Sequence, residues 1–402
     1  MSALPYPWLV ADIGGTNARF GLVTGPGARP SQVAVLAGAE HRTLPDAVAA
    51  YLAEHADGGR PGAACLAVAG PVEGDRYTLT NLPWAGSARD LGVPNATLLN
   101  DFEALALSLP HLDGDDLVPI GGPGGPGAGP VPGPGVKAVL GPGTGLGVAG
   151  LVPVGSGWLP IASEGGHVSV PVQDDRELEV LRVLRAQARR SGRPGSPAVT
   201  PARTPAVAPV HGEADQVVAE RVLSGPGLVR LHRALAEVNG VTAPELAASD
   251  IVARQDDPLC AETIEVFCGM LGSFAANVAL TLGARGGVYL GGGVLPRIVE
   301  RVCAGDFRAR FTANPDMSGY LDAIATMLIV APQPALTGAA AWLARQSAGQ
   351  STTMSTTVST TLSTTVSTTT STGTSAAAPA AASDAPAAGA APGGLTTTTA
   401  TP

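Results

Sequence analysis

Two segments with the same order of residues constrain the fold most. Residues 8–23 are WLVADIGGTNARFGLV, and residues 138–152 are AVLGPGTGLGVAGLV. In each, an apolar strand enters a glycine turn and a second strand leaves it, which predicts a β-hairpin. A dinucleotide-binding turn would open a helix instead. The second segment formally contains GxGxxG, but the apolar residues after it predict more strand, so this match is predicted to be false.

Such turns let a bare backbone approach an anion. Glycine has no Cβ, and successive N–H groups form a nest. In the first turn, Gly14 and Gly15 precede Thr16, whose hydroxyl adds a donor, and Asp12 lies where a divalent cation could be held beside phosphates. A third glycine cluster at 291–293 follows an expected strand and could lie against an adenine or ribose. The alternative for each hairpin is that glycine only makes a tight turn.

Polar residues follow another expected strand, at the start of a helix. Asp101 would lie at this strand end, facing a cleft, and accept a proton from a substrate hydroxyl. The alternative is purely local, because Asn100 and Glu103 have the spacing of a capping box.

Glu164 and His167 are candidates for binding a polyol, and Glu220 is a further polar candidate for the site. Glu164 and His167 flank a Gly-Gly turn that we expect to lead into a strand, and Glu220 is expected on a helix that breaks at 224–227. Asn81 and Trp84 form a candidate sugar-facing loop. The alternatives are that His167 is a structural histidine, that Glu220 is a solvated carboxylate on a helix, and that Asn81 forms a local turn.

Charge and lysine content exclude several functions. The net charge of −9 argues against a nucleic-acid partner. Lys137 is the only lysine, and Ala138 follows it, so the chain has no P-loop. Schiff-base chemistry would depend on this one residue, within an expected strand.

The expected location is the cytoplasm. No apolar run is expected to span a membrane, and the N-terminal residues lack the pattern of a secretory signal. The four cysteines have no paired spacing, which favours free thiols in a reducing compartment.

The chain divides into parts of different composition. From 347 to 402 the only charged residue is Asp384, and STTM, STTV, STTL, STTV and STTT repeat in the stretch 351–370, which predicts a disordered tail. The Gly/Pro-rich run 121–135 and the Pro-rich stretch 191–209 are expected as a loop or linker and a surface insertion. The remaining length predicts two domains.

Taken together, several blocks resemble one family. DIGGTNAR, LTNLPW, LLNDFEALA, GPGTGLGVA, EGGHV, ERVLSGPGLVRL and GGVYLGGGVLPR resemble, in order and spacing, bacterial glucokinases of the non-ROK type from residue 8 to about 345. The cysteine-rich zinc motif of the ROK branch is missing after His167. The resemblance implies an α/β, two-domain, actin-like (ribonuclease H-like) ATPase fold with an interdomain cleft. It implies a small domain at 1–108, completed by a helix at about 335–346, and a large domain at 109–334.

The resemblance also implies an activity and a set of site residues. The activity is transfer of the γ-phosphoryl group of ATP to the 6-hydroxyl of glucose, with Mg²⁺ as cofactor and a homodimer as the assembly. A kinase for another hexose and a non-catalytic sugar-sensing protein are the alternatives. Asp101 matches the catalytic base, and Asn100, Glu164, His167 and Glu220 match the glucose ligands. The ATP-binding residues would be Ala11, Asp12, Ile13, Gly14, Gly15, Thr16, Gly143, Thr144, Gly145, Gly291, Gly292 and Gly293.

Overall fold

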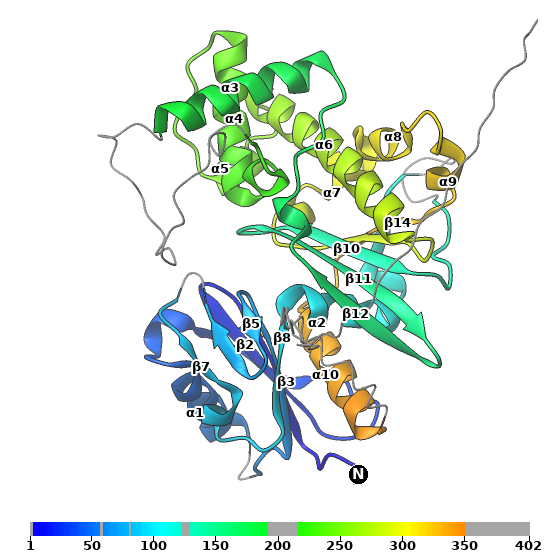
Figure 1. The fold of residues 1–402 in the computed structure, drawn as a ribbon. Coiled ribbons are helices and arrows are strands. Elements are labelled where there is room, and N and C mark those ends of the chain that lie inside the picture. The colour runs from blue at the N-terminus through cyan, green and yellow to red at the C-terminus, as the bar shows by residue number, and fades with distance from the viewer. Residues whose placement is uncertain (1–2, 57–58, 80–81, 122–128, 192–215, 350–402) are drawn as a thin grey trace, which may run out of the picture. The chain divides into compact units, whose positions relative to one another are not determined.

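A computed structural model describes residues 3–56, 59–79, 82–121, 129–191 and 216–349 (Figure 1). The expected tail at 347–402 lies outside these residues except for its first three positions. The central part of the run 121–135, residues 122–128, and nearly all of the insertion 191–209 also lie outside them.

A five-stranded sheet is built from the N-terminal part of the chain. In spatial order its strands are β3 (Ser31–Ala37), β2 (Asn17–Val23), β1 (Trp8–Ile13), β4 (Ala63–Val68) and β8 (Ala96–Asn100). β1 is antiparallel to β2 and parallel to β4, and β4 is parallel to β8. The first predicted hairpin is therefore confirmed.

The alternation of side chains along β1 decides which way its carboxylate faces. Leu9 and Ile13 are fully buried in a core that α1 (Leu44–His55) covers, whereas Trp8 and Val10 belong to a second core on the other face. Because side chains alternate with a period of two, Asp12 shares a face with Trp8 and Val10. This is the face that packs against α10 (Pro334–Ser347).

A six-stranded sheet contains the second hairpin. In spatial order its strands are β12 (Gly157–Ser163), β11 (Leu146–Val154), β10 (Lys137–Pro142), β13 (Val288–Leu290), β14 (Thr326–Ile329) and β9 (Leu117–Pro119). β10 and β11 are antiparallel, and no helix follows the GxGxxG match, as predicted. A small separate sheet contains β5 (Val72–Glu73), β6 (Arg76–Thr78) and β7 (Ala85–Ser87).

Most of the remaining helices pack against the six-stranded sheet in a buried cluster, the outer core, which includes Leu140, Leu290 and Leu328 of that sheet. These helices are α3 (Asp175–Ser191), α4 (Gly225–Asn239), α5 (Ala248–Ala253), α6 (Pro258–Leu282), α7 (Val299–Ala304), α8 (Phe307–Thr312) and α9 (Ser318–Asp322). The 3₁₀ turns are η1 (Gly38–Glu40), η2 (Ala88–Leu91), η3 (Leu109–His111), η4 (Gly114–Asp116), η5 (Gly165–His167), η6 (Ala219–Arg221) and η7 (Leu295–Arg297).

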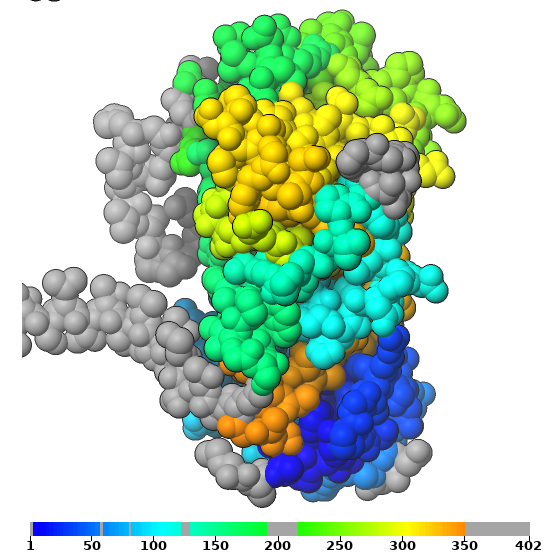
Figure 2. Space-filling view, turned by 90° about the vertical axis from the view of Figure 1, so that its right-hand side faces the viewer, coloured from blue at the N-terminus to red at the C-terminus, as the bar shows by residue number. Residues whose placement is uncertain are grey.

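Two helices share one core with both sheets. α10 packs against β1, β4 and α2 (Asp101–Ser108), and α2 in turn packs against β10, β11 and β12. Their contact is close, because a Cβ at Gly338 of α10 would overlap the carbonyl oxygen of Ala104 of α2. In Figure 2 α10 is exposed on one side, beside the N-terminal strands. The division into domains at residues 108 and 109 stays a prediction.

One helix departs from the expectation about membrane spans. Within the described residues, α6 is long and apolar enough to cross a membrane by length and composition. However, 72% of its most apolar window is buried inside the structure. Phe267, Leu271 and Phe274 of this helix are almost fully buried in the outer core. The apolarity of α6 therefore matches its place at the centre of that core.

Candidate active site

The register of the parallel strands brings the first glycine turn and Asp101 to one edge of the sheet. Ile13 of β1 pairs with Val68 of β4, which pairs with Asn100 of β8. These three residues end their strands in one row, so Gly14 and Asp101 both leave from the same edge. Two strand spacings separate β1 from β8, which is about 10 Å. The predicted position of Asp101 at a strand end is confirmed.

The carboxyl group of Asp101 lies in a poorly solvated, negatively charged environment. Its pKa is raised to about 6, mainly by burial and to a smaller extent by the nearby charge of Asp12. Hydrogen bonds act in the opposite direction, since the backbone N–H of Phe102 donates to Asp101 Oδ1 at 3.0 Å. A carboxyl group with such a pKa can take up a proton near neutral pH, as a general base must.

Asn100 caps α2, so the predicted capping box is confirmed, and it is compatible with a separate role for Asp101. Its Oδ1 accepts a hydrogen bond from the N–H of Phe102 at 2.9 Å, and Glu103 Oε2 accepts one from the N–H of Asn100 at 3.0 Å. The capping box fixes where the helix begins and therefore where Asp101 points. The cap uses Oδ1 of Asn100 and does not involve the amide NH₂ group, so a sugar-binding role for that group stays a prediction.

The first glycine turn has free backbone donors beside an ion pair. The N–H of Gly14 donates to the Asn17 carbonyl at 3.0 Å, whereas within the described part of the chain the N–H groups of Gly15 and Thr16 donate to no protein atom. Arg19 Nη1 lies 3.2 Å from Asp12 Oδ2. Burial raises the pKa of Asp12 despite this arginine.

Arg19 was not among the sequence candidates. It lies directly opposite Asp12 in the hairpin register. The spacing of the two residues around the predicted turn was the signal that could have identified this pair.

The second glycine turn is held by its neighbours. The N–H of Gly143 donates to the Gly145 carbonyl, and the N–H of Gly225 donates to the Gly143 carbonyl, each at 2.8 Å. The N–H of Leu146 donates to Glu220 Oε2 at 2.9 Å. Glu220 is therefore not the solvated helix carboxylate of the alternative interpretation.

The third glycine cluster lies next to the second turn. Leu140 of β10 and Leu290 of β13 are paired in parallel, so β13 ends two residues before β10 does. The N–H of Gly291 donates to the Leu140 carbonyl at 2.9 Å. The residues predicted to bind phosphate and adenosine thus share one edge of the six-stranded sheet.

The candidate sugar ligands gather at the start of β11. His167 Nε2 lies 3.8 Å from Glu164 Oε2, and both side chains are exposed. The N–H of Ala219 donates to the Val168 carbonyl at 2.8 Å, which ties the turn of His167 to the turn of Glu220. Residues far apart in the sequence therefore meet beside the second glycine turn.

One aromatic side chain connects the two groups of site residues. A Cβ at Gly147 would overlap the ring of Phe102, the residue after Asp101. Glycine at this position lets α2 approach β11 closely. The start of α2 thus contacts the second hairpin, while Asp101 lies within electrostatic range of Asp12 of the first.

Three local predictions are wrong. The strand expected after His167 is a single bridge between Ser169 and Val218. Glu220 lies on the 3₁₀ turn η6, and a helix begins rather than breaks beyond it, because Ser224 caps α4. Trp84 does not face a sugar site: it is 2% exposed, and its Nε1 donates to the His41 carbonyl. In each case, packing against residues distant in the sequence determines the local structure. Asn81 lies outside the described residues.

Lysine chemistry is excluded at the site. Lys137 lies in β10, as predicted, and its Nζ donates to the Gly286 carbonyl and to the Tyr289 hydroxyl, each at 3.1 Å. Burial lowers its pKa. The four cysteines are free thiols, as predicted.

Comparisons with known proteins identify the family of the chain. The family model described as glucokinase matches residues 9–193 and 197–346. A glucokinase of Saccharophagus degradans is 44% identical over 348 residues, which cover 84% of this chain and 98% of the relative. One of Aromatoleum aromaticum is 42% identical over 351 residues, covering 86% and 96%.

A solved structure agrees as well. The crystal structure of a glucokinase from an Antarctic psychrotroph is 34% identical and has a TM-score of 0.69, covering 84% of this chain and 98% of that one. The family model and both relatives cover more than four fifths of the chain, so the chain belongs to the glucokinase family.

Proposed function

We propose that this protein is a glucokinase that transfers the γ-phosphoryl group of ATP to the 6-hydroxyl of glucose, giving glucose 6-phosphate and ADP. The observation that carries the proposal is the position of Asp101. Its carboxyl group, whose pKa is raised to about 6, shares a sheet edge with a glycine turn that has free N–H donors.

Asp101 acts as the base. The 6-hydroxyl oxygen attacks the γ-phosphorus as the bond from that phosphorus to the bridging oxygen of ADP breaks, and the hydroxyl proton passes to the Asp101 carboxylate. Phosphoryl transfer has a loose transition state, so positioning and charge neutralisation contribute more than the strength of the base.

Backbone groups hold the phosphates, because no lysine is available for them. We assign two turns to the phosphate oxygens: the first, residues 14–16, through the N–H groups of Gly15 and Thr16 and the Thr16 hydroxyl, and the second, residues 143–145. The free donors of Gly15 and Thr16 support this assignment. The cluster at 291–293 would lie on the adenosine side.

The residues at the first turn also fit Mg²⁺. Among the described residues no three acidic, histidine or cysteine side chains form a metal cluster. However, Mg²⁺ bound with a nucleotide commonly takes only one or two carboxylates, together with phosphates and water. Asp12 is such a carboxylate. Its negative charge raises the pKa of Asp101, which shows that the site has a negative potential that a bound cation would reduce. The ion would neutralise phosphate charge.

The sugar would be oriented by four residues beside the second turn and at the start of α2. We assign Glu164, His167, Glu220 and the Asn100 amide to the glucose hydroxyls, because carboxylates, imidazole and amide supply both donors and acceptors. Exposure of Glu164 and His167 supports their availability.

The division of the chain belongs to the same proposal. A small domain of residues 1–108, completed by the helix at about 335–346, and a large domain of residues 109–334 would close on the sugar and exclude water, which competes for the γ-phosphate. A cytoplasmic location and a homodimer are part of this proposal.

The test is the Asp101→Asn variant in an assay coupled to glucose 6-phosphate formation. We expect kcat to fall by about a hundredfold or more, because general-base catalysis typically contributes that much. Glucose affinity, measured by calorimetry, should stay nearly unchanged. Asp115→Asn, on the exposed turn η4, is the matched control and should retain full activity.

Two outcomes would contradict the proposal. Full turnover by Asp101→Asn would overturn the assignment of the base. Glucose binding without any ATP consumption by the unaltered chain would favour a sugar-sensing protein. Comparing kcat/KM for glucose, mannose and fructose, each with ATP, ADP or polyphosphate, would establish both substrates.

A further inference from the structure

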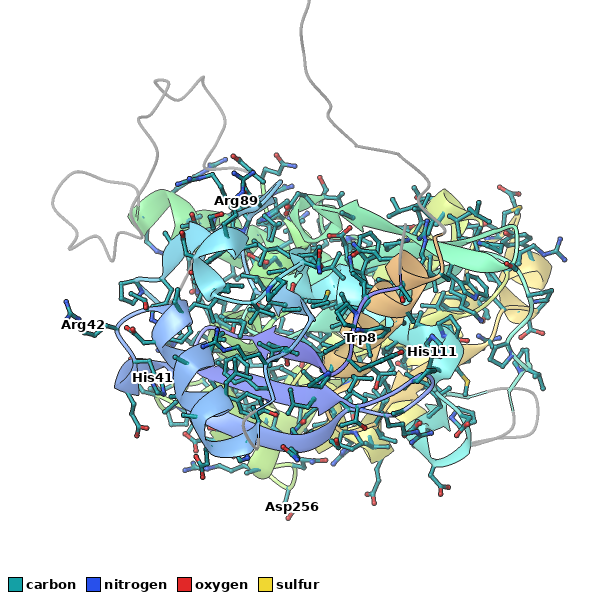
Figure 3. The ribbon with its side chains drawn as sticks, turned by 90° about the horizontal axis from the view of Figure 1, so that it is seen from below. Trp8, His41, Arg42, Arg89, His111 and Asp256 are labelled. Carbon is teal, nitrogen blue, oxygen red and sulfur yellow. The ribbon has the colours of Figure 1, made fainter. Side chains whose placement is uncertain are left out.

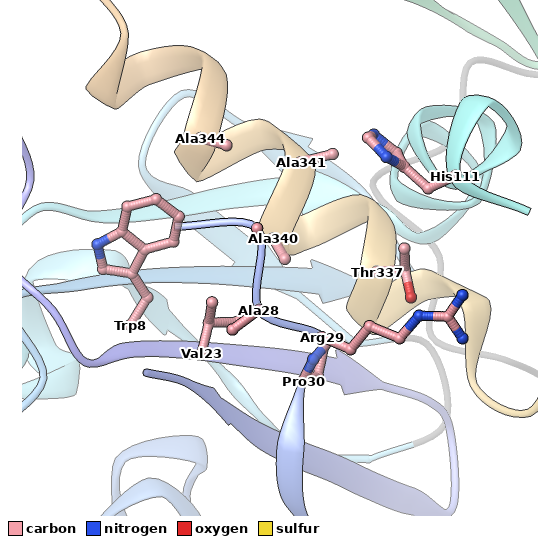
Figure 4. Close-up of a pocket in the computed structure, with 11 residues that line it drawn as sticks. Trp8, Val23, Ala28, Arg29, Pro30, His111, Thr337, Ala340, Ala341 and Ala344 are labelled. Carbon is pink, nitrogen blue, oxygen red and sulfur yellow. The ribbon is translucent and has the colours of Figure 1, made fainter. Parts of the chain in front are cut away.

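A pocket of about 280 Å³ lies at the end of the β1–β2 hairpin opposite its glycine turn (Figure 4). Trp8, the first residue of β1, and Val23, the last of β2, are paired across the hairpin and form part of its wall. Ala340 and Ala344 of α10 line another wall, and His111 of η3 closes one side. None of these residues belongs to the candidate active site.

The pocket is divided into an apolar end and a polar end. Figure 4 shows the Trp8 ring at one end and the side chains of Arg29, His111 and Thr337 at the other. None of the described residues that line the pocket is acidic. In a chain with a net charge of −9, a pocket that has one arginine and no carboxylate favours an anion.

The two basic side chains of the polar end have no protein partners. Within the residues that the structure describes, neither Arg29 nor His111 forms a side-chain hydrogen bond or an ion pair. A carboxylate or phosphate group on a ligand could accept hydrogen bonds from Arg29, His111 and the Thr337 hydroxyl together.

We propose that this pocket binds a small amphipathic anion, with an apolar, ring-sized body against Trp8 and one carboxylate or phosphate group between Arg29 and His111. The volume is at the lower end of ligand pockets, which favours a monocyclic compound over a nucleotide. The walls are continuous with the active site, since β1 continues to Asp12 and η3 follows α2, which begins at Asp101.

Calorimetry with four simple probes tests the proposal. Phenyl phosphate and benzoate carry both a ring and an anionic group, whereas benzyl alcohol lacks the charge and inorganic phosphate lacks the ring. Each is titrated into the full chain saturated with glucose and a non-hydrolysable ATP analogue, so that phosphate probes cannot report on the nucleotide site. We expect one or both of the ring-bearing anions to bind at least about tenfold more tightly than the other two probes. Comparing the affinities of phenyl phosphate and benzoate also shows whether the pocket prefers a phosphate or a carboxylate group.

Three variants test whether the anions bind in this pocket. Arg29→Gln should weaken the ring-bearing anions by about tenfold, the usual effect of losing one hydrogen bond to a charged group. Arg42→Gln removes the same charge from an exposed site away from His111 (Figure 3) and should leave binding unchanged. Ala341→Leu should reduce binding of both ring-bearing anions by filling the pocket. Unaltered glucose phosphorylation shows that each variant is folded.

Several results would overturn the proposal. They are binding of benzyl alcohol as tight as that of the tighter ring-bearing anion, an equal effect of Arg29→Gln and Arg42→Gln on that anion, full binding of it by Ala341→Leu, or no binding of either ring-bearing anion to the unaltered chain.

Discussion

At the residue scale, the charge state of Asp101 sets the pH dependence of the reaction. Its pKa is raised to about 6 by burial and by the charge of Asp12. A base works only when ionised, so kcat/KM for glucose, measured at ATP well below its KM, should fall as the pH decreases below about 6. Above that value the profile should be flat until another group titrates.

The pH profile of kcat/KM needs a control that the protein stays folded at low pH. Circular dichroism at pH 5 should match that at pH 7.5, so that loss of activity reports protonation rather than unfolding. Activity that stays constant down to pH 5 would contradict the assignment of Asp101 as the titrating base.

Glu220 has two roles that substitutions can separate. Its carboxylate accepts a hydrogen bond from the N–H of Leu146 in the second glycine turn, and it is also a proposed sugar ligand. Glu220→Gln keeps an acceptor for Leu146, so we expect a higher KM for glucose and a nearly unchanged KM for ATP. Glu220→Ala leaves the N–H without its partner and should raise both values, each by about tenfold or more.

Steady-state kinetics with glucose and ATP varied in turn measure the effect. Glu237→Gln, on the exposed surface of α4, serves as a control for the loss of a carboxylate. If the two Glu220 variants have the same KM for ATP, the carboxylate does not support the turn.

At the element scale, the contact between α2 and β11 positions the catalytic helix. Gly147→Ala would push its new methyl group against the Phe102 ring, so we expect lower kcat and a loss of stability of about 1–3 kcal/mol, as overpacking usually costs. The Phe102→Ala, Gly147→Ala double variant should recover part of that loss, because the ring is gone.

A double-mutant cycle, measured by urea unfolding and by kcat, gives the coupling between the two residues. Additive effects would show that the helix and the hairpin do not depend on this contact. Gly319→Ala, at a position with open space around the glycine, is the matched control and should change neither quantity by much.

The elements that the sequence predicted correctly are those whose pattern is local. Both hairpins follow from apolar strands on either side of a glycine turn, and the capping box follows from Asn100 and Glu103. The surroundings of Glu220, His167 and Trp84 were predicted wrongly, because they depend on packing against distant segments. Trp84, for example, is buried by a core that includes α1, over thirty residues earlier.

At the scale of the whole molecule, the core shared by the two sheets should make unfolding cooperative. Val10 and Cys65 of the first sheet, and Val139 and Met327 of the second, belong to one buried cluster with α2 and α10. Exposing either sheet would therefore expose the other. We expect urea unfolding followed by circular dichroism and by tryptophan fluorescence to give one coincident transition.

Tryptophan positions make this a sensitive comparison. Trp84 lies in the core of the first sheet and Trp158 on the edge strand of the second, so separate unfolding would appear as two fluorescence steps. Two resolved transitions would contradict the idea that the shared core couples the sheets. Saturating glucose and a non-hydrolysable ATP analogue should shift a single transition to higher urea.

The arrangement of the site was only partly predictable from the sequence. The resemblance to glucokinases identified which residues to consider, but the partner of Glu220 was not among the predictions. That contact joins Leu146 to a residue more than seventy positions later, and it requires the six-stranded sheet to be folded. The partner of Asp12 could be found because Arg19 lies within the same hairpin.

The burial of Lys137 has a practical consequence for work with this protein. Its Nζ is engaged by Gly286 and Tyr289, and it is the only lysine in the chain. Succinimidyl esters and aldehyde fixatives would therefore find no lysine on the surface. Fluorophore attachment, cross-linking for mass spectrometry and resin immobilisation should instead use arginine- or carboxyl-directed reagents.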